Sequence, residues 1–577
     1  MPQQAPEPFR FCEAVYPSKA ARMQTQLIDE DKEWGSEWTR VADVVVVGSG
    51  VAGLTAAVQA ARAGSTVLVL ERALLAGGTT AKSGGVLWIP NNRYMRARGL
   101  VDDRSDAIRY MAKSAYPTHY NAQHPSLGLP PEKLRLIETF YDMGHVAIDA
   151  LVDDGVLALE EIFYPDYYAD MPEDTAPVGR ALKPLTWEGF RRGIDKLEGQ
   201  ILIDQLLAAC EKLGVQFQTD SRVLQLLKDP QGEVIGAEVR AGRRTELMGA
   251  RQGIVFATGG FLHNPKLALE YLRGPVMGGA ACEGSTGDFI PMATALGASL
   301  GNMTHAWWSQ LVLELALRNR STLRDVYSPY GDSMLMVNRH GKRVMNEKAT
   351  YNERGQVHFH WDAGAREYPN HLLFWLFDDA LVNNPQPSRF QFPIPTPGET
   401  LDYVISAPTW AQLAAKVSVR LQQLSPHTGG VTLDNAFQVN LQATLERFNT
   451  MALAGNDLDF ARGESPIEKA WAQAPRPGAA SGAMHPLSDS GPYHCIILAA
   501  AALDTKGGPI TDTQARVLDQ NDEPIPGLFG AGNCVASPAG QAYWGAGGTI
   551  GVALTYGFIA GQQAAQRPRR MGAELQL

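Results

Sequence analysis

The sequence predicts an α/β fold in which one domain is interrupted by a second, α+β domain. Residues 43–71 run through a short apolar stretch, a glycine-rich turn, a helical stretch and a second apolar stretch, which is typical of a βαβ unit in a parallel sheet. Glycine-rich segments return after about residue 491, so the first domain is expected to draw its chain from both ends. The residues between them carry aromatic, β-rich segments and long loops rich in proline and asparagine, such as 383–400.

These patterns divide the chain into four parts. Residues 1–40 are expected to be an N-terminal extension, and residues 41–312 the first part of a nucleotide-binding domain with a helical insertion at about 100–195. The inserted α+β domain is expected to span residues 313–490, and residues 491–577 to complete the first domain.

Composition argues against several classes of protein and site. The 577 residues have a net charge of −10 and no basic run that could follow a nucleic-acid backbone, so no nucleic acid is expected as a partner. The five cysteines are far apart and form no CxxC pair, which argues against a disulfide framework, a structural zinc site and a cysteine-bound iron–sulfur cluster, and no metal site is predicted. No run of 18 apolar residues and no secretory signal is seen, and the chain is expected to be cytoplasmic.

The turn inside the βαβ unit carries a dinucleotide-binding pattern. Gly48, Gly50 and Gly53 form GxGxxG between the first strand and the helix, and Glu71 ends the second strand. The first glycine suits a tight turn, the second lets the backbone approach a pyrophosphate at the helix N-terminus, and the third allows the helix to pack closely on the strand. The acidic side chain is expected to bind the ribose hydroxyls, so the pattern predicts a Rossmann-type dinucleotide site.

Four further segments favour FAD over NAD. GGTTAKSGG at 77–85 offers small hydroxyls and bare amides, ATGG at 257–260 ends a later strand, and GLFGAGN at 527–533 and GAGGTIG at 545–551 form a second glycine-rich region. The last segment opens a helix whose N-terminal dipole would stabilise negative charge on a reduced flavin. The remaining residues expected to contact FAD are Arg72, Gly78, Thr79, Ser83, Gly84, Gly85, Ala257, Gly259, Gly532, Asn533, Gly548 and Ile550.

With these segments in this order, the chain from about 42 to 565 resembles the flavoprotein superfamily of fumarate reductases, succinate dehydrogenases and 3-ketosteroid dehydrogenases. Two departures count against a dicarboxylate substrate. The fumarate-reductase arginine before the last glycine-rich turn is replaced by the sequence 541–545, QAYWG, and a cation is what a carboxylate needs. The histidine that binds flavin covalently in succinate dehydrogenases is absent from 77–85, so FAD is expected to be non-covalent.

Three short segments are instead similar to the 3-ketosteroid 1,2-dehydrogenases. They are YPDYYAD at 164–170, MNEKATYNERG at 345–355 and AYWGAG at 542–547. The resemblance implies that Tyr167, Tyr351, Tyr543 and Gly547 are the catalytic residues, and that the inserted domain is the catalytic and substrate domain.

The resemblance also implies a role for each of these residues. The Tyr543 hydroxyl and the Gly547 amide would donate hydrogen bonds to the ketone oxygen, as in an oxyanion hole. Tyr351 would remove the proton beside the carbonyl, and hydride would leave the next carbon for the flavin. An ordinary phenol has a pKa of about 10, so Tyr167 is expected to favour the Tyr351 phenolate through a hydrogen bond.

The predicted partner is therefore a small apolar cyclic ketone, with a steroid favoured because tyrosines on apolar walls suit a large uncharged ligand. Three alternatives stay open: a smaller ketone of the cyclohexanone type, an alkene reductase related to the fumarate reductases, and a flavin-binding structural protein. The electron acceptor is unknown, and peripheral contact with a membrane is left open.

Two aromatic and histidine-containing runs admit both structural and functional interpretations. The run 305–308, HAWW, could line the substrate pocket but is favoured as core. The run 358–361, HFHW, is interpreted as a strand with both histidines on one face and Phe359 and Trp361 on the other. A structural role is favoured for both histidines, because no further metal ligands are evident.

Overall fold

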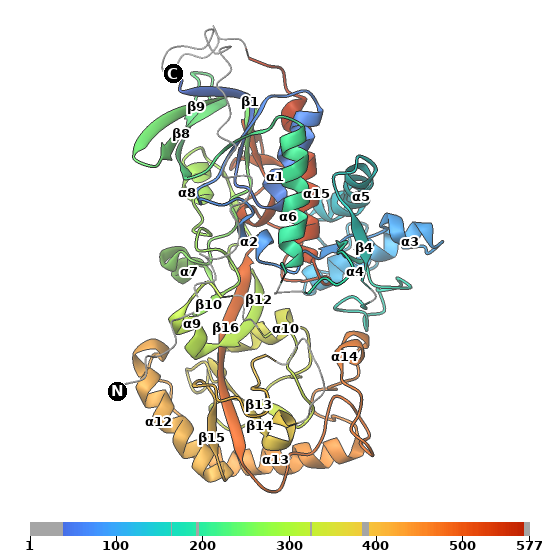
Figure 1. Cartoon of the computed structure of the whole chain (residues 1–577), viewed down its shortest axis with the longest axis vertical. Coiled ribbons are helices and arrows are strands. Elements are labelled where there is room, and N and C mark those ends of the chain that lie inside the picture. Colours follow the sequence, from blue (N-terminus) through green and yellow to red (C-terminus); the bar gives the residue numbers. More distant parts are fainter. Residues whose placement is uncertain (1–37, 163, 192–194, 323–325, 384–391, 571–577) are drawn as a thin grey trace.

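The computed structural model describes residues 38–162, 164–191, 195–322, 326–383 and 392–570. The predicted α/β class is confirmed, with two large sheets that lie one above the other in Figure 1. Of the expected N-terminal extension, only residues 38–40 fall within the described chain, where Trp38 packs against Ile235.

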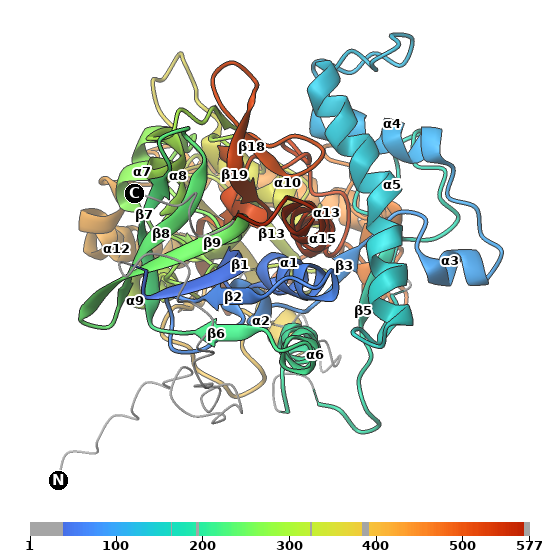
Figure 2. The same ribbon diagram turned by 90° about the horizontal axis from the view of Figure 1, so that it is seen from above.

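The first sheet has the strand order β18-β19-β9-β1-β2-β6, with the β7–β8 hairpin added beside β9. Strands β1, β2, β6, β9 and β19 run parallel, and Figure 2 shows them side by side. Their bounds are β1 Arg40–Val47, β2 Val67–Leu70, β6 Gln216–Gln218, β7 Ser221–Lys228, β8 Val234–Ala241, β9 Arg244–Phe256, β18 Arg516–Leu518 and β19 Pro524–Gly530. Because β19 pairs with β9, the C-terminal part of the chain completes a sheet that begins at β1.

The position of β1 inside the sheet explains why the first apolar run does not alternate between apolar and polar residues. Val44 and Val46 belong to the core that includes the helices α1 (Val51–Arg62) and α15 (Gly548–Ala565), whereas Val45 and Val47 belong to the core on the opposite face. A strand covered on both faces has no position for a polar side chain. Helix α1 starts at Val51, directly after Gly50, and so begins inside the GxGxxG pattern rather than after it.

Helices α1 and α15 pack closely because glycines of α15 lie against the α1 backbone. A Cβ on Gly557 would lie 2.3 Å from the Ala52 carbonyl oxygen, and one on Gly561 would lie 2.2 Å from that of Ala56. The spacing of four residues puts both glycines on one face of the helix. This packing brings the first and last parts of the chain together at the nucleotide site.

The predicted helical insertion forms the flank of the first sheet (Figures 1 and 2). It contains α4 Arg104–Ala115 and α5 Pro131–Asp153, and its strands β4 Leu159–Glu161 and β5 Ala181–Pro184 form a small sheet with β3 Leu87–Trp88, which precedes the predicted insertion together with α3 Arg93–Ala97. Helix α6 Glu198–Lys212 then returns the chain to the first sheet.

The second sheet is built around the long strand β16 (Tyr493–Thr505), which runs up the lower half of Figure 1. Its partners are β10 Gly278–Gly279, β12 Ala306–Val312, β14 Leu372–Asp378 and β15 Ile405–Ala407, and β13 Met334–Val337 pairs with β14. Helices α12 Trp410–Thr428 and α13 Phe437–Ala454 pack on one face of this sheet. The remaining described elements are α2 Gly78–Ala81, α7 Pro265–Tyr271, α8 Phe289–Thr294, α9 Leu313–Arg318, β11 Leu300–Gly301, α10 Tyr351–Gln356, η3 Val357–Phe359, α11 Asp379–Val382, α14 Pro466–Trp471, β17 Gly508–Pro509 and η4 Gly532–Cys534.

Strands β12 and β16 belong to the second sheet, although the sequence places them just outside the expected inserted domain of 313–490. The division of the chain into domains at about 313 and 491 remains a prediction. In the part of the chain that the structure describes, no helix is both long and apolar enough to cross a membrane.

The prediction of a strand at 358–361 is wrong. Val357–Phe359 is a short 3-10 helix (η3), so the two histidines do not share a face. The His358 side chain is buried and contacts the Gln310 amide and the Asn370 carbonyl, while Trp361 is exposed. These contacts fit the structural role favoured for His358.

Candidate active site

The three glycines of the GxGxxG turn differ in what surrounds them. A Cβ on Gly48 would lie 2.4 Å from the Ala257 carbonyl oxygen, and one on Gly53 would lie 2.0 Å from the Gly48 carbonyl oxygen. At Gly50 the nearest atom is the Thr80 hydroxyl oxygen at 3.6 Å. The first and third glycines are therefore required for packing, whereas the second faces open space at the N-terminus of α1, where a pyrophosphate could approach.

Glu71 is buried beside this turn. Its carboxylate accepts hydrogen bonds from the Ser49 hydroxyl at 2.6 Å, the Ser49 amide at 3.1 Å and the Ala73 amide at 2.8 Å. Glu71 thus fixes the turn, and its predicted contact with a ribose remains a prediction. The neighbouring Arg72 contacts the Gly284 carbonyl and the Thr286 hydroxyl.

The segment 77–85 lies directly against the glycine turn. The Thr80 hydroxyl accepts a hydrogen bond from the Val51 amide, and the Thr79 hydroxyl accepts one from the Cys282 amide. A Cβ on Gly78 would meet nothing closer than 3.9 Å, so this glycine adds to the open space beside Gly50. Ser83, Gly84 and Gly85 close the segment, with the Gly85 amide bonded to the Ser83 hydroxyl.

The second glycine-rich region meets the first at the N-terminus of α15. Gly532 lies against Ala52 of α1, and the side-chain oxygen Oδ1 of Asn533 accepts a hydrogen bond from the Trp307 indole at 2.9 Å. Gly548 and Ile550 lie in the first turn of α15, which has no side-chain cap. Ala257 and Gly259 follow β9, and the amide of Gly260 donates to the buried Asp504 carboxylate at 2.9 Å.

These residues fit FAD on two structural grounds. The Thr258 hydroxyl is buried without a hydrogen-bond partner among the described residues, and it follows Ala257, a position expected to contact the cofactor. The open glycines and two uncapped helix N-termini provide bare amides for phosphate oxygens and negative charge. Residues from both ends of the chain would hold FAD, as the sequence predicts.

The three predicted catalytic tyrosines form one cluster. The hydroxyl oxygens of Tyr167 and Tyr351 lie 2.9 Å apart, and the ring centroid of Tyr543 lies 5.5 Å from that of Tyr167 and 5.3 Å from that of Tyr351. All three side chains are buried. Aromatic rings from Tyr327, Trp307 and Trp471 surround the cluster.

Burial raises the pKa of all three phenols. The pKa of Tyr351 and that of Tyr167 are raised well above 10, and for Tyr351 the two neighbouring phenols add to the effect of burial. The expected hydrogen bond between Tyr167 and Tyr351 is present, but in this site it adds to burial in raising the pKa of Tyr351 and does not favour the Tyr351 phenolate.

Groups at the start of α15 converge on the Tyr543 hydroxyl. Burial raises the pKa of Tyr543, and the Thr549 hydroxyl, the Tyr351 hydroxyl and the amides of Thr549 and Gly547 oppose this rise. A Cβ on Gly548 would lie 3.4 Å from the Tyr543 ring, so this ring lies against the start of α15.

Gly547 is needed for the backbone whatever its role toward a substrate. Its φ is +90°, and a Cβ there would lie 2.4 Å from the Val86 carbonyl. The Gly547 carbonyl also accepts a hydrogen bond from the Trp88 amide of β3. Glycine is thus the only residue that fits, and a donor role for its amide remains a prediction.

A buried arginine positions the segment that carries Tyr167. Arg180 is fully buried and donates to Asp102 through two hydrogen bonds of 2.8 Å, and also to Asp166 and Asp174. Asp166 directly precedes Tyr167, whose amide donates to the Trp544 carbonyl at 3.2 Å. The insertion is therefore tied to the residue that follows Tyr543.

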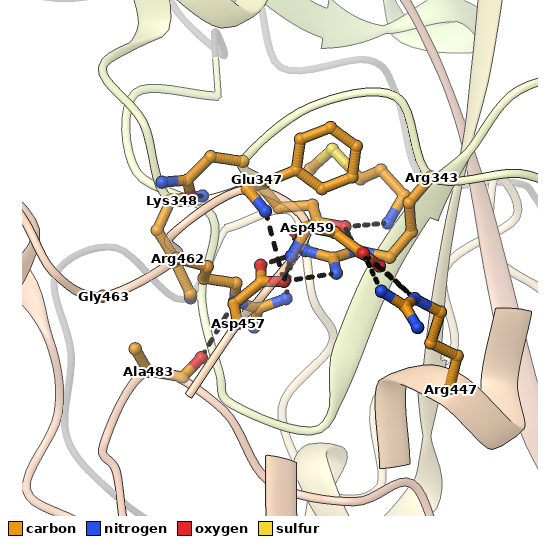
Figure 3. Close-up of polar contacts among 12 residues, drawn as sticks. Arg343, Glu347, Lys348, Arg447, Asp457, Asp459, Arg462, Gly463 and Ala483 are labelled. Atoms are coloured by element: carbon orange, nitrogen blue, oxygen red, sulfur yellow. Dashed lines mark hydrogen bonds and ion pairs between the residues drawn. The ribbon is translucent and has the colours of Figure 1, made fainter. Parts of the chain in front are cut away.

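A second buried ion cluster fixes the segment before Tyr351 (Figure 3). Arg343 donates twice to Glu347 at 2.8 Å and also pairs with Asp457 at 2.7 Å, and Arg462 lies 3.3 Å from Glu347. Glu347 and Arg462 are fully buried. Because Glu347 lies four residues before Tyr351, this cluster holds the chain that leads into α10.

Sequence reasoning missed Lys506, and it treated Trp307 as core. Lys506 is fully buried, with Nζ 4.1 Å from the Trp307 ring centroid and 2.7 Å from the Ala542 carbonyl oxygen. The Trp307 ring in turn packs edge-on against Tyr543, with centroids 5.0 Å apart. A lone lysine among glycines gives no sequence signal, because only folding brings it to Tyr543.

Comparison with known proteins agrees with this geometry. The profile of a family described as FAD binding domain matches residues 43–550. The chain is 32% identical over 563 residues to 4-oxocyclohexanecarboxylate 2-dehydrogenase from Sinomonas cyclohexanicum, an alignment that covers 91% of this chain and 92% of the relative. It is 30% identical over 595 residues to 3-oxosteroid 1-dehydrogenase from Mycolicibacterium smegmatis, covering 90% and 96% of the two chains.

A solved structure supports the fold. The 3-ketosteroid delta1-dehydrogenase from Sterolibacterium denitrificans, in complex with 1,4-androstadiene-3,17-dione, superposes with a TM-score of 0.77 at 24% identity and covers 91% of this chain and 100% of that chain. The family match spans the two glycine-rich regions that meet at α1 and α15. The chain therefore belongs to the FAD binding domain family and is an FAD-dependent dehydrogenase.

Proposed function

We propose that this protein introduces a 1,2-double bond into a 3-ketosteroid. The observation that carries the proposal is the cluster of Tyr351, Tyr167 and Tyr543 at the N-terminus of the helix expected to face the flavin. The similarity to a 3-oxosteroid 1-dehydrogenase over nine-tenths of this chain supports the same chemistry.

Each residue of the cluster has a task in this reaction. Tyr543 and the Gly547 amide donate hydrogen bonds to the ketone oxygen and stabilise the negative charge that develops there. Tyr351 Oη, as phenolate, accepts the proton from the carbon beside the carbonyl, and Tyr167 Oη, 2.9 Å away, would donate a hydrogen bond to that phenolate once it forms. FAD, when bound, supplies the acceptor for the hydride that leaves the adjacent carbon.

The surroundings of the cluster suit an uncharged ring system. Trp307, Tyr327 and Trp471 present aromatic walls, and Trp471 also lines a pocket together with Tyr330 and Lys348. An apolar ligand gains free energy when such walls exclude water from it.

A smaller cyclic ketone is a second candidate. It is favoured by the 32% identity to an enzyme named for 4-oxocyclohexanecarboxylate, a single ring with a ketone and a carboxylate. The same tyrosines would remove the proton beside the carbonyl, so the two candidates differ only in what the rest of the pocket contacts.

One experiment separates these candidates. The purified yellow protein is mixed without oxygen with androst-4-ene-3,17-dione, with cyclohexanone, with 4-oxocyclohexanecarboxylate, and separately with fumarate and a reduced dye. We expect the steroid to bleach the flavin absorbance and the Tyr351→Phe variant to stay yellow. Bleaching by a single-ring ketone alone would overturn the steroid assignment, and reoxidation of the dye by fumarate alone would overturn the dehydrogenation of ketones.

A further inference from the structure

The peptide bond that precedes Tyr543 is held at both ends. At its carbonyl end, Lys506 Nζ donates to the Ala542 oxygen at 2.7 Å. At its amide end, the Tyr543 N–H donates to the Tyr168 hydroxyl at 3.1 Å, and that hydroxyl donates to the Glu353 carboxylate at 2.8 Å. A lysine amine therefore lies at one end of the peptide and a carboxylate, one hydroxyl away, at the other.

The groups in this chain come from the segments that carry the tyrosine cluster. Tyr168 directly follows Tyr167, and Glu353 lies two residues after Tyr351 on α10. Lys506 follows the end of β16, the central strand of the second sheet. The hydrogen bonds thus link the three catalytic segments to each other through the main chain of Tyr543.

Lys506 supports the side chain of Tyr543 as well as its main chain. Its Nζ lies 4.1 Å from the centroid of the Trp307 ring, and that ring packs edge-on against Tyr543. The Trp307 indole is itself fixed by its hydrogen bond to Asn533. A lysine that only filled space would need neither the contact with the Trp307 ring nor the hydrogen bond to the Ala542 carbonyl.

Full burial makes this lysine costly. Desolvation lowers the pKa of Lys506 well below its ordinary value, and the charge of Glu353 opposes that shift. An apolar side chain of similar size would fill the same volume without the cost of a buried amine. Filling the core therefore does not explain why this position carries a lysine.

We propose that Lys506, with Tyr168 and Glu353, is a set of positioning residues that aims the Tyr543 hydroxyl at the ketone oxygen of the substrate. The proposal rests on the proposed function, in which Tyr543 donates to that oxygen. A donor displaced by about 1 Å can slow a reaction by about 100-fold, so a main-chain constraint next to the donor affects the rate.

The first test measures the constraint itself and does not depend on turnover. Hydrogen exchange of the FAD-loaded enzyme is compared between wild type, Lys506→Met and the control Lys348→Met. Lys348 is a partly buried lysine that is likewise bonded to main-chain carbonyls, those of Pro329 and Gly331. We expect faster exchange over 541–548 in Lys506→Met only. Unchanged exchange there in Lys506→Met, or an equal change in the control, would overturn the proposal.

The second test asks whether Lys506 acts through Tyr543. Flavin reduction by the ketone is measured in a single turnover for Lys506→Met, Tyr543→Phe and the double variant. We expect Lys506→Met to slow reduction by about 10- to 100-fold, and the double variant to be no slower than Tyr543→Phe. Lys506→Arg, which keeps an N–H donor, should recover part of the rate.

The outcomes separate the two proposals. If the double variant reduces the flavin more slowly than Tyr543→Phe by the factor that Lys506→Met causes alone, Lys506 has a general structural role. That result would overturn the positioning proposal. If no ketone reduces the wild-type flavin, the proposed function fails, and the exchange over 541–548 alone decides whether Lys506 constrains Tyr543.

Discussion

The hydroxyl oxygens of Tyr167 and Tyr351 lie 2.9 Å apart although 184 positions separate the two residues in the chain. Tyr167 comes from the insertion that flanks the first sheet, and Tyr351 starts α10 beside the second sheet. A proton acceptor and the group that assists it are therefore assembled from two separate parts of the fold.

Tyr351→Phe is expected to abolish the proposed reaction while FAD stays bound. Without the phenol no group accepts the proton beside the carbonyl, and loss of a general base typically slows a reaction by about 10²- to 10⁴-fold. The measurement is deuterium exchange at the carbon beside the carbonyl together with flavin bleaching. Retention of both at the wild-type rate would contradict the role of Tyr351.

Tyr167→Phe is expected to have a smaller effect in the same direction. A hydrogen bond to a charged group contributes about 1.5–3 kcal/mol, which corresponds to roughly a 10- to 100-fold slower proton abstraction. Substrate affinity, measured by titration of the flavin spectrum, should change little. A loss as large as that of Tyr351→Phe would instead make Tyr167 the proton acceptor.

The rate of flavin reduction is expected to rise with pH between about 7.5 and 10. The pKa of Tyr351 is raised well above 10, so the fraction of phenolate grows roughly tenfold per pH unit throughout this range. Burial raises the pKa of the Asp504 carboxyl to about 6. This group is therefore almost fully ionised at about pH 7.5, and its titration does not contribute to the rise in rate between about pH 7.5 and 10. A flat profile in stopped-flow reduction, with Tyr351→Phe as the control, would contradict phenolate formation before or during the slow step.

Gly547→Ala is expected to destabilise the protein more than Gly64→Ala. Both glycines have positive φ, +90° and +86°, and each alanine would cost about 1–2 kcal/mol for that backbone conformation. Only at Gly547 would the added Cβ also overlap the backbone of Val86, whereas Gly64 has nothing within 4 Å. Thermal unfolding midpoints and FAD retention measure the difference, and equal shifts would refute the close approach.

Arg180→Met is expected to destabilise the insertion by about 3–5 kcal/mol, because it leaves Asp102 and Asp166 buried without their cation. The control is Arg447→Met, which removes an exposed ion pair with Asp459 and should destabilise the protein far less. Denaturant unfolding followed by fluorescence compares the two. Similar small losses would show that the Arg180 cluster does not hold the Tyr167 segment in place.

The sequence alone determined what depends on local spacing. The strand, glycine turn and helix at 43–71 could be predicted because periodicity and glycine positions act within a few residues of each other. Resemblance added the order of Tyr167, Tyr351 and Tyr543, and the fold class followed from glycine-rich segments at both ends. The strand expected at 358–361 failed, because an alternation of only four residues is too short to overcome the packing around His358.

Tertiary structure decided the contacts between segments that are far apart in the chain. The burial of Lys506 against Trp307 and Ala542, the ion cluster around Arg180 and the high pKa of Tyr351 arise only when both sheets and the insertion pack together. The physical reason is that desolvation and long-range hydrogen bonds depend on which atoms surround a group in space. The residue types in this site were visible in the sequence, but their burial and their partners were set by the fold.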